Sequence, residues 1–268
     1  MVQRSAILNV MTTAAQKAAR GLVRDFGEIE HLQVSKKGTA DFVSIADKKA
    51  EKIIVYELSK ARPNFGFLLE EGGEIKGQDT SNRWIVDPLD GTTNFLHGLP
   101  HFSISIALER DGEPAAGVVY EPLTDQMFTA EKGQGAHLNN HRIRVSGRHE
   151  LTESLFCTGI PFAGRGPQSD HERFLKQLGA VMGISSGVRR FGSAALDLAY
   201  VAAGRYEGFW ESGLEVWDMA AGIILVREAG GYVTDLKGGN DMMESGEIVA
   251  ANDLLQVKLL EILSQAEK

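Results

Sequence analysis

The apolar positions of this chain follow a helical spacing in some segments and a strand spacing in others. In residues 5–25 they recur every three or four positions, which predicts an amphipathic helix. A second helix is expected to begin at Ser44, with Asp47 in its first turn, and to end before Pro63. The same spacing predicts four later helices, over residues 168–181, 193–203, 216–229 and 252–266.

Strand patterns dominate the segment between the second helix and residue 140. The sequences "FGFLLEE" (65–71) and "RWIVD" (83–87) predict short buried strands. Alternation with intervening turn residues over 102–140 predicts antiparallel hairpins. One face of the first hairpin is expected to carry four apolar side chains, those of Phe102, Ile104, Ile106 and Leu108.

The remaining segments complete a mixed pattern. Residues 206–212 ("YEGFWES") predict a strand, whereas the polar segment 33–44 is predicted to be a loop. Helices and strands therefore share one chain without an internal repeat or a linker, which indicates an α/β (α+β) protein. We expect one domain over residues 1–268, divisible into lobes of residues 1–150 and 151–268.

Composition and charge narrow the class of protein. The chain has 268 residues and a formal net charge of −8, which argues against direct nucleic-acid binding. Its single cysteine, Cys157, excludes an internal disulfide and fits a reducing compartment. The sequence has neither a secretory signal pattern nor an apolar run long enough to span a membrane. These features predict a cytoplasmic protein without a membrane partner.

Acidic residues stand where predicted strands end, and buried carboxylates must be paired or bound to metal. Glu70 ends one strand, Asp87 and Asp90 follow "WIV", and Asp218 stands just inside a helix. Oxygen ligands of this kind suit Mg²⁺, and the lack of Cys or His in these clusters disfavours zinc. His97 and His101 are separated by a proline and are predicted to be loop or surface residues.

The segment 87–93, "DPLDGTT", combines paired acids with a tight turn and a possible helix start. Pro88 fixes the backbone and is expected to turn the carbonyl of Leu89 outward. Gly91 permits a tight turn. Thr92 and Thr93 can then begin a helical turn whose N–H groups receive a phosphate. Acids for a metal beside a helix start for phosphate predict metal-assisted phosphate-ester hydrolysis.

Competing motifs are weaker. "GISSG" (183–187) matches the nucleophile elbow of hydrolases, but no histidine follows His171 in the chain, so a Gly/Ser turn is predicted. No phosphate-binding loop of the G-x-x-x-x-G-K-[ST] type is present. Phosphatases of the haloacid dehalogenase type carry a similar acidic loop, but there one residue separates the acids, whereas two separate them here.

Four segments together resemble the inositol monophosphatase family in its bacterial form: "LLEEGG", "WIVDPLDGTTNFLHGLPHFSISIAL", "GSAALDLAYVAAG" and "WDMAAGIILVREAGG". They occur in family order and spacing over nearly the whole chain. The resemblance implies a layered αβαβα sandwich of the inositol monophosphatase/fructose-1,6-bisphosphatase type. It also implies two or three Mg²⁺ ions per site, sensitivity to lithium and a homodimer.

The resemblance further implies roles for individual residues. The implied metal ligands are four carboxylates and one backbone carbonyl, those of Glu70, Asp87, Asp90, Asp218 and Leu89. Glu70 and Thr92 would orient the attacking water, with Asp47 as an acidic partner. The implied substrate contacts are Asp90, Gly91, Thr92, Gly192, Ser193, Ala194, Glu211 and Asp218. Ser193 replaces the threonine of many relatives and keeps the hydroxyl, while the sequence near Glu215 differs from animal relatives and leaves substrate preference there open.

We therefore expect a Mg²⁺-dependent phosphomonoesterase that hydrolyses inositol 1-phosphate by direct attack of a metal-activated water. The alternatives are fructose 1,6-bisphosphate, histidinol phosphate or a 3′-phosphoadenosine nucleotide as substrate, or a regulatory binding protein on the same fold. The basic segment 35–38 ("SKKG") has two interpretations of equal standing. It either closes over the site with Lys36 near the phosphate or forms a solvated turn.

Overall fold

The computed structural model describes residues 4–28, 34–37, 41–161 and 168–266, with side chains omitted for 34–37, 41–44 and 168–169. The helices are α1 (Ala6–Gly27), α2 (Ile45–Ala61), α3 (Thr92–Leu96), α4 (Gln168–Met182), α5 (Ala194–Ala202), α6 (Val216–Glu228), α7 (Met242–Ser245) and α8 (Asp253–Ala266). The strands of the first half are β1 (Val34–Lys37), β2 (Asp41–Ser44), β3 (Phe65–Leu69), β4 (Gly73–Ile75), β5 (Asp79–Asp90), β6 (Ser103–Arg110), β7 (Glu113–Glu121), β8 (Gln126–Glu131), β9 (Gly135–Leu138) and β10 (His141–Arg142). Those of the second half are β11 (Leu155–Thr158), β12 (Gly187–Arg189), β13 (Gly208–Ser212), β14 (Tyr232–Thr234) and β15 (Glu247–Ala251).

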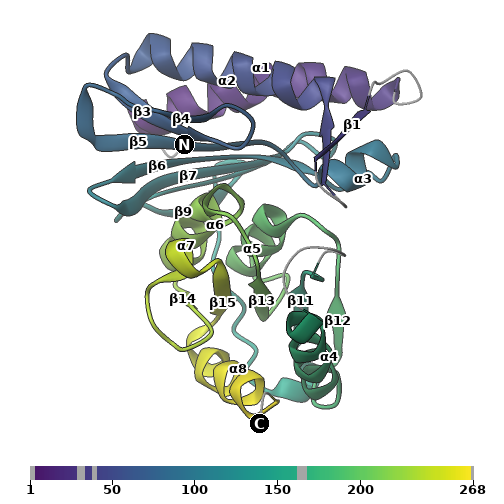
Figure 1. Cartoon of the computed structure of the whole chain (residues 1–268). Coiled ribbons are helices and arrows are strands. Elements are labelled where there is room, and N and C mark those ends of the chain that lie inside the picture. Colours follow the sequence, from purple (N-terminus) through teal and green to yellow (C-terminus); the bar gives the residue numbers. More distant parts are fainter. Residues whose placement is uncertain (1–3, 29–33, 38–40, 162–167, 267–268) are drawn as a thin grey trace.

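Two sheets alternate with three layers of helices (Figure 1). The larger sheet has the strand order β10-β9-β8-β7-β6-β5-β3-β4, and the smaller one the order β12-β11-β13-β15-β14. Helices α1 and α2 cover one face of the larger sheet, α5 and α6 lie between the sheets, and α4 and α8 cover the far side of the smaller sheet. This order confirms the predicted αβαβα sandwich.

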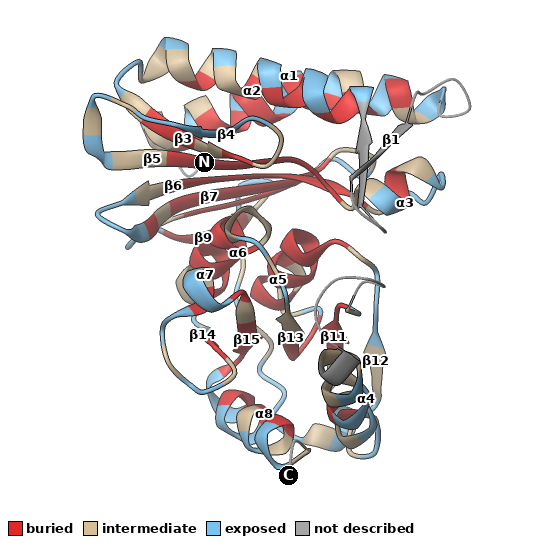
Figure 2. Cartoon of the chain, in the orientation of Figure 1, coloured by how far each residue is buried: buried red, intermediate tan, exposed pale blue. Residues whose placement is uncertain are grey.

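The alternation of β6 explains how one sheet can join two cores. Its residues Ile104 and Ile106 are fully buried against α1 and α2, as the spacing predicts. Ala107, between Ile106 and Leu108, faces the opposite side and packs with α5 and α6. Both faces are therefore shielded from solvent, and the middle layer is buried over most of α5 and the centre of α6 (Figure 2). A sheet covered on both faces holds its strand ends in fixed positions.

Several sequence predictions need correction. The segment 33–44 is not a plain loop, because β1 and β2 pair as an antiparallel hairpin within it. The strands β11, β12, β14 and β15 were not predicted from the sequence. The first three are only three or four residues long, too short to show a period. By contrast, residues 183–186 form the predicted turn.

The membrane expectation can be compared with the helices themselves. Among the residues that the structure describes, no helix combines the length and the apolar character that crossing a membrane requires.

Candidate active site

Strand pairing brings the acidic strand ends together. β3 and β5 run parallel with Leu69 opposite Val86, and the N–H of Glu70 donates to the carbonyl of Val86 at 3.2 Å. The pairing of β5 with β6 is irregular between Asp87 and Asp90, so the chain bulges there. Because the carboxyl ends of parallel strands lie at the same end of a sheet, Glu70 after β3 and the acids at the end of β5 are neighbours.

Helix α6 adds the last carboxylate from the middle layer. The hydroxyl of Ser105, which lies opposite Asp87 in the sheet, donates to the carbonyl of Trp217 at 3.1 Å. This bond fixes the start of α6 against the larger sheet. Asp218 follows, and its Oδ2 accepts the N–H of Glu215 at 2.8 Å. Carboxylate oxygens of Asp87, Asp90 and Asp218 then lie within 4.8 Å of one another.

The three carboxylates destabilise each other's charge. Burial raises the pKa of Asp87 well above its usual range, and the charges of Glu70, Asp90, Asp218 and Asp47 raise it further. Burial and the charge of Asp90 likewise raise the pKa of Asp218. Close, oxygen-only donors, of which Asp87 and Asp90 are buried, suit a hard divalent cation, and a bound cation would offset this repulsion. The described residues therefore fit the implied metal.

Asp90 differs from its neighbours because it receives several hydrogen bonds. Its Oδ2 accepts the hydroxyl of Ser193 at 2.5 Å and the N–H of Ala195 at 2.9 Å. Burial raises its pKa to about 6, while the bonds from Ser193 and the N–H groups of Ala195, Ala194 and Leu196 act in the opposite direction. Asp90, the last residue of β5, thus contacts the start of α5, beside the residues predicted to face the substrate.

The turn after β5 has the predicted form. Gly91 adopts a left-handed conformation with φ of 93°, and Thr92 begins the short helix α3. The N–H of Leu89 donates to Oδ1 of Asp87 at 2.9 Å, and the hydroxyl of Thr92 donates to the carbonyl of Leu89 at 2.9 Å. A Cβ on Gly91 would lie 3.3 Å from the carbonyl oxygen of Gly192, so the two glycine segments are in close contact.

Asn94 connects this turn with the loop before α5, a role that sequence reasoning missed. Its side-chain amide donates to the carbonyls of His101 at 2.8 Å and Phe191 at 2.7 Å. The half-buried ring of His101 stacks near Phe191, with 5.0 Å between ring centroids. His101 is a loop residue, as predicted, but it belongs to the packing around the site. His97 is an exposed residue at the end of α3.

Glu211 stands at the end of β13 on the opposite side of the site. A Cβ on Gly159 would lie 1.7 Å from its Oε1, so only glycine leaves space for this carboxylate. Burial raises the pKa of Glu211 to about 8, and Asp90 adds to the shift while Arg190 opposes it. Asp197 of α5, fully buried nearby, has its pKa raised by burial and by the charge of Glu211. Neither Gly159 nor Asp197 has a local sequence signal.

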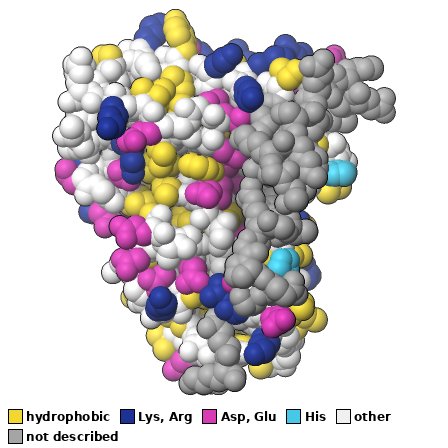
Figure 3. Space-filling view, in the orientation of Figure 1, with side chains coloured by type: hydrophobic (Ala, Val, Ile, Leu, Met, Phe, Trp, Pro, Cys, Tyr) yellow, Lys and Arg dark blue, Asp and Glu magenta, His cyan; other side chains and the backbone are white. Residues whose placement is uncertain are grey.

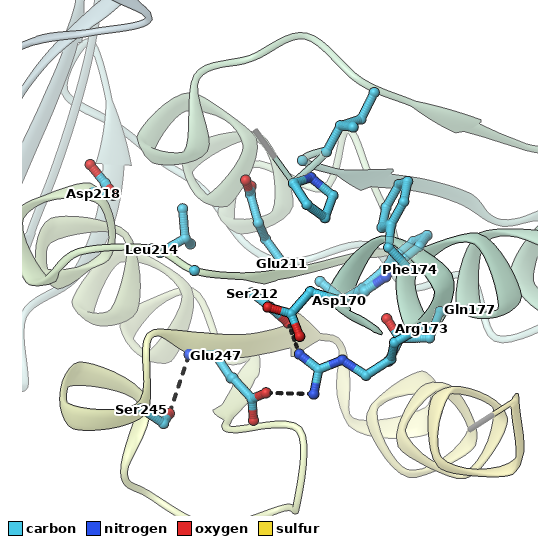
Figure 4. Close-up of a pocket in the computed structure, with 15 residues that line it drawn as sticks. Asp170, Arg173, Phe174, Gln177, Glu211, Ser212, Leu214, Asp218, Ser245 and Glu247 are labelled. Atoms are coloured by element: carbon cyan, nitrogen blue, oxygen red, sulfur yellow. Dashed lines mark hydrogen bonds and ion pairs between the residues drawn. The ribbon is translucent and has the colours of Figure 1, made fainter. Parts of the chain in front are cut away.

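A cavity of about 390 Å³ adjoins these residues and has both Glu211 and Asp218 in its wall (Figure 4). Acidic side chains are prominent through the middle of the face drawn in Figure 3. Asp47 is buried in the first turn of α2, and its charge contributes to the raised pKa of Asp87. The side chain of Lys36 lies outside the described residues. The arrangement can bind cations on one side and a hydroxylated molecule on the other.

Comparison with known proteins gives a consistent result. The model of the inositol monophosphatase family matches residues 3–268. The inositol-1-monophosphatase of Mesorhizobium japonicum is 58% identical over 262 residues, covering 98% of this chain and 97% of that protein. The Nus factor SuhB of Vibrio cholerae is 46% identical over 247 residues, covering 92% and 91%. The crystal structure of extragenic suppressor protein suhB from Bartonella henselae has a TM-score of 0.94 at 58% identity, covering 97% of this chain and 99% of that one.

Proposed function

The chain belongs to the inositol monophosphatase family, a family of phosphatases, and from that premise we propose that it is a Mg²⁺-dependent phosphomonoesterase acting on inositol 1-phosphate. The observation that carries the proposal is the convergence of three carboxylates, within 4.8 Å, beside a wall formed by Glu211. The match of the family model and the identity to inositol-1-monophosphatases confirm the family resemblance expected from the sequence, whereas the metal, the substrate and the residue roles are our inference.

We assign the cations to Asp87, Asp90 and Asp218, with Glu70 and the carbonyl of Leu89 completing the donor set. Bound Mg²⁺ supplies Lewis-acid chemistry, activating water and stabilising negative charge on the leaving oxygen. Two or three ions per site are consistent with the number of donors. The carboxylates would hold the cations where the ends of β3 and β5 approach the start of α6.

The chain's own residues orient the water and the phosphate. The hydroxyl of Thr92 donates a hydrogen bond to the carbonyl of Leu89, so its oxygen lone pairs stay available to accept a hydrogen bond from water. Glu70 and Thr92 are the proposed pair that directs this water, and buried Asp47 supports them from α2. Backbone N–H groups of Gly91 and Thr92 are proposed to donate to phosphate oxygens.

The leaving alcohol is proposed to lie between the start of α5 and the end of β13. Glu211 can accept hydrogen bonds from ring hydroxyls, and the segment Gly192–Ser193–Ala194 borders the same space through its contact with Asp90. Asp90 and Asp218 adjoin both the cations and the alcohol. This distribution favours a polyol ester, in which several hydroxyls need acceptors.

A second candidate function is regulation through a protein partner. Its support is the 46% identity to a protein named Nus factor SuhB. Every carboxylate that the family resemblance implies as a metal ligand is present in this chain. This favours an active enzyme and is compatible with a second role. A homodimer in the cytoplasm is the state that the family suggests, and light scattering on the purified protein tests the dimer.

The test of the main proposal is phosphate release from a panel of esters with and without Mg²⁺ and with added Li⁺. Mg²⁺-dependent, lithium-inhibited hydrolysis that favours inositol 1-phosphate is expected. Preference for fructose 1,6-bisphosphate, histidinol phosphate or a nucleotide would retain the metal chemistry and overturn the substrate. No release from any ester by a folded, Mg²⁺-binding protein would favour the regulatory role, which a pull-down with the Asp90→Asn variant can then examine.

A further inference from the structure

The cavity beside Glu211 extends away from the metal side, between α4 and the smaller sheet (Figure 4). Its wall includes one guanidinium and four carboxylates among the described residues: Arg173, Asp170, Glu211, Asp218 and Glu247. Trp210 and Phe174 supply apolar surface. At about 390 Å³ the cavity can accept a group larger than the reacting phosphate.

Arg173 is held in place by a pair of neighbours on two adjacent strands. Its guanidinium donates to the hydroxyl of Ser212 at 3.1 Å and pairs with Oε1 of Glu247 at 2.9 Å. Ser212 and Glu247 are directly opposite each other in the antiparallel pairing of β13 and β15. The N–H of Glu247 also bonds the hydroxyl of Ser245 at 3.2 Å. The pairing of β13 and β15 therefore fixes Ser212 and Glu247 side by side, and Arg173 contacts both of them from α4.

This pairing decides the charge that a ligand meets. The side chains of Arg173 and Glu247 are only 30% and 18% exposed, so solvent screens them incompletely. With its charge offset by Glu247, Arg173 is poorly placed to bind an anion. Among the described residues of the wall, Asp170 is the carboxylate that belongs neither to this ion pair nor to the proposed metal and substrate site. Carboxylates accept hydrogen bonds from hydroxyls and ammonium groups but repel a phosphate.

We propose that Asp170 and Glu247, with Arg173 held between Glu247 and Ser212, are specificity determinants that exclude esters carrying a second phosphate and admit an uncharged polyol. The proposal rests on the proposed phosphatase function and adds residues that lie outside its metal site. It accounts for a cavity that contains an arginine and yet has an acidic wall.

The experiment compares two esters that differ only in the second phosphate, fructose 1-phosphate and fructose 1,6-bisphosphate. The measured quantity is the ratio of kcat/KM for the bisphosphate to kcat/KM for the monophosphate, in Mg²⁺. Asp170→Asn and Glu247→Gln each remove one negative charge from the wall and are expected to raise this ratio roughly threefold to tenfold. Arg173→Gln removes the positive charge and is expected to lower it by a similar factor.

Glu113→Gln is the matched control, because it changes the net charge equally at an exposed ion pair with Arg227 (3.4 Å) outside the cavity wall. Melting temperatures identify any variant that fails to fold, and Asp170→Asn leaves the Arg173 contacts intact. A ratio that is unchanged in all the cavity variants, or that moves in one direction regardless of charge, overturns the proposal.

Binding of the same two esters, measured by calorimetry in the presence of Mg²⁺, distinguishes failure of this inference from failure of the proposed function. Hydrolysis of inositol 1-phosphate with a flat ratio rejects the specificity determinants alone. If no ester is hydrolysed but the cavity variants change the affinity for the bisphosphate relative to the monophosphate in the predicted directions, the phosphatase function is rejected and the selectivity of the cavity is retained. Absence of both hydrolysis and binding overturns both.

Discussion

The hydroxyl of Ser193 donates a 2.5 Å hydrogen bond to Oδ2 of Asp90, across 103 positions of sequence. This bond joins the end of β5 to the start of α5, and the N–H of Ala195 reaches the same oxygen at 2.9 Å. Two donors on one oxygen fix the orientation of the carboxylate. The proposed metal ligand is thereby positioned by the segment that borders the proposed substrate space.

Ser193→Ala removes the shorter of these bonds and is expected to weaken Mg²⁺ binding about tenfold, because groups that orient a ligand tune the metal's affinity. Ser193→Thr keeps a hydroxyl and is expected to retain most of the affinity. Calorimetric titration of Mg²⁺ into both variants makes the comparison. Equal affinities in the alanine and threonine variants would show that the bond does not support a metal ligand.

Asp90→Asn keeps the size of the side chain and removes its charge. Turnover is expected to fall by roughly a hundredfold or more, while the fold stays intact because the amide oxygen can still accept from Ser193. Phosphate release and circular dichroism measure the two effects. Asp111→Asn, at an exposed turn position with φ of 53° that asparagine tolerates, is the control. An Asp90→Asn protein with most of its activity would remove Asp90 from the metal site.

Long periodic elements could be predicted from the sequence. The amphipathic spacing that begins near Ser5 gave the helix, and the structure adds the cap, in which the N–H of Leu8 donates to the Ser5 hydroxyl at 3.1 Å. The inward row of β6, including Ile104 and Ile106, was predicted from alternation alone. In these segments the buried positions recur with the period of the helix or strand, so the pattern of apolar residues in a single sequence is enough to predict the element.

Apart from β13, which lies within the predicted strand 206–212, the strands of the smaller sheet and the supports of the site could not be predicted in this way. β11 has only four residues, and its parallel partners β12 and β13 lie far along the chain. Asn94 acts on the carbonyl of Phe191, and Gly159 makes room for Glu211, so each role depends on a tertiary contact. Asn94 lies within a segment that resembles the family and Gly159 does not, but at neither position does the residue type indicate which tertiary contact it makes. The acids of the site were identified from the sequence because carboxylates at the ends of buried strands are unusual.

Gly159→Ala tests whether space for Glu211 is a requirement. The added Cβ would lie 1.7 Å from Oε1, so the carboxylate must move. We expect roughly a 1–3 kcal/mol loss in the free energy of unfolding, as for other overpacked interiors, together with a higher KM for inositol 1-phosphate. Gly147→Ala is the control, since a Cβ there meets no atom within 4 Å. If both alanine variants behave like the wild type, Glu211 does not need its present position.

Glu211→Gln is expected to change the pH dependence of the free energy of unfolding and, separately, to lower activity. Burial raises the pKa of Glu211 to about 8 from the ordinary value of 4.5, so between these values the folded state holds a proton that the unfolded state has released. Wild-type stability therefore falls as pH rises from about 4.5 to about 8, and the glutamine variant lacks this loss. In metal-free protein the variant should gain roughly 1–3 kcal/mol relative to wild type over that range, while losing activity on polyol esters. Urea unfolding at a series of pH values, with the exposed Glu74→Gln as control, measures the difference. Parallel pH profiles for wild type and Glu211→Gln would mean that this carboxylate is ionised in the folded protein throughout the range, and its placement in a desolvated wall of the cavity would be wrong.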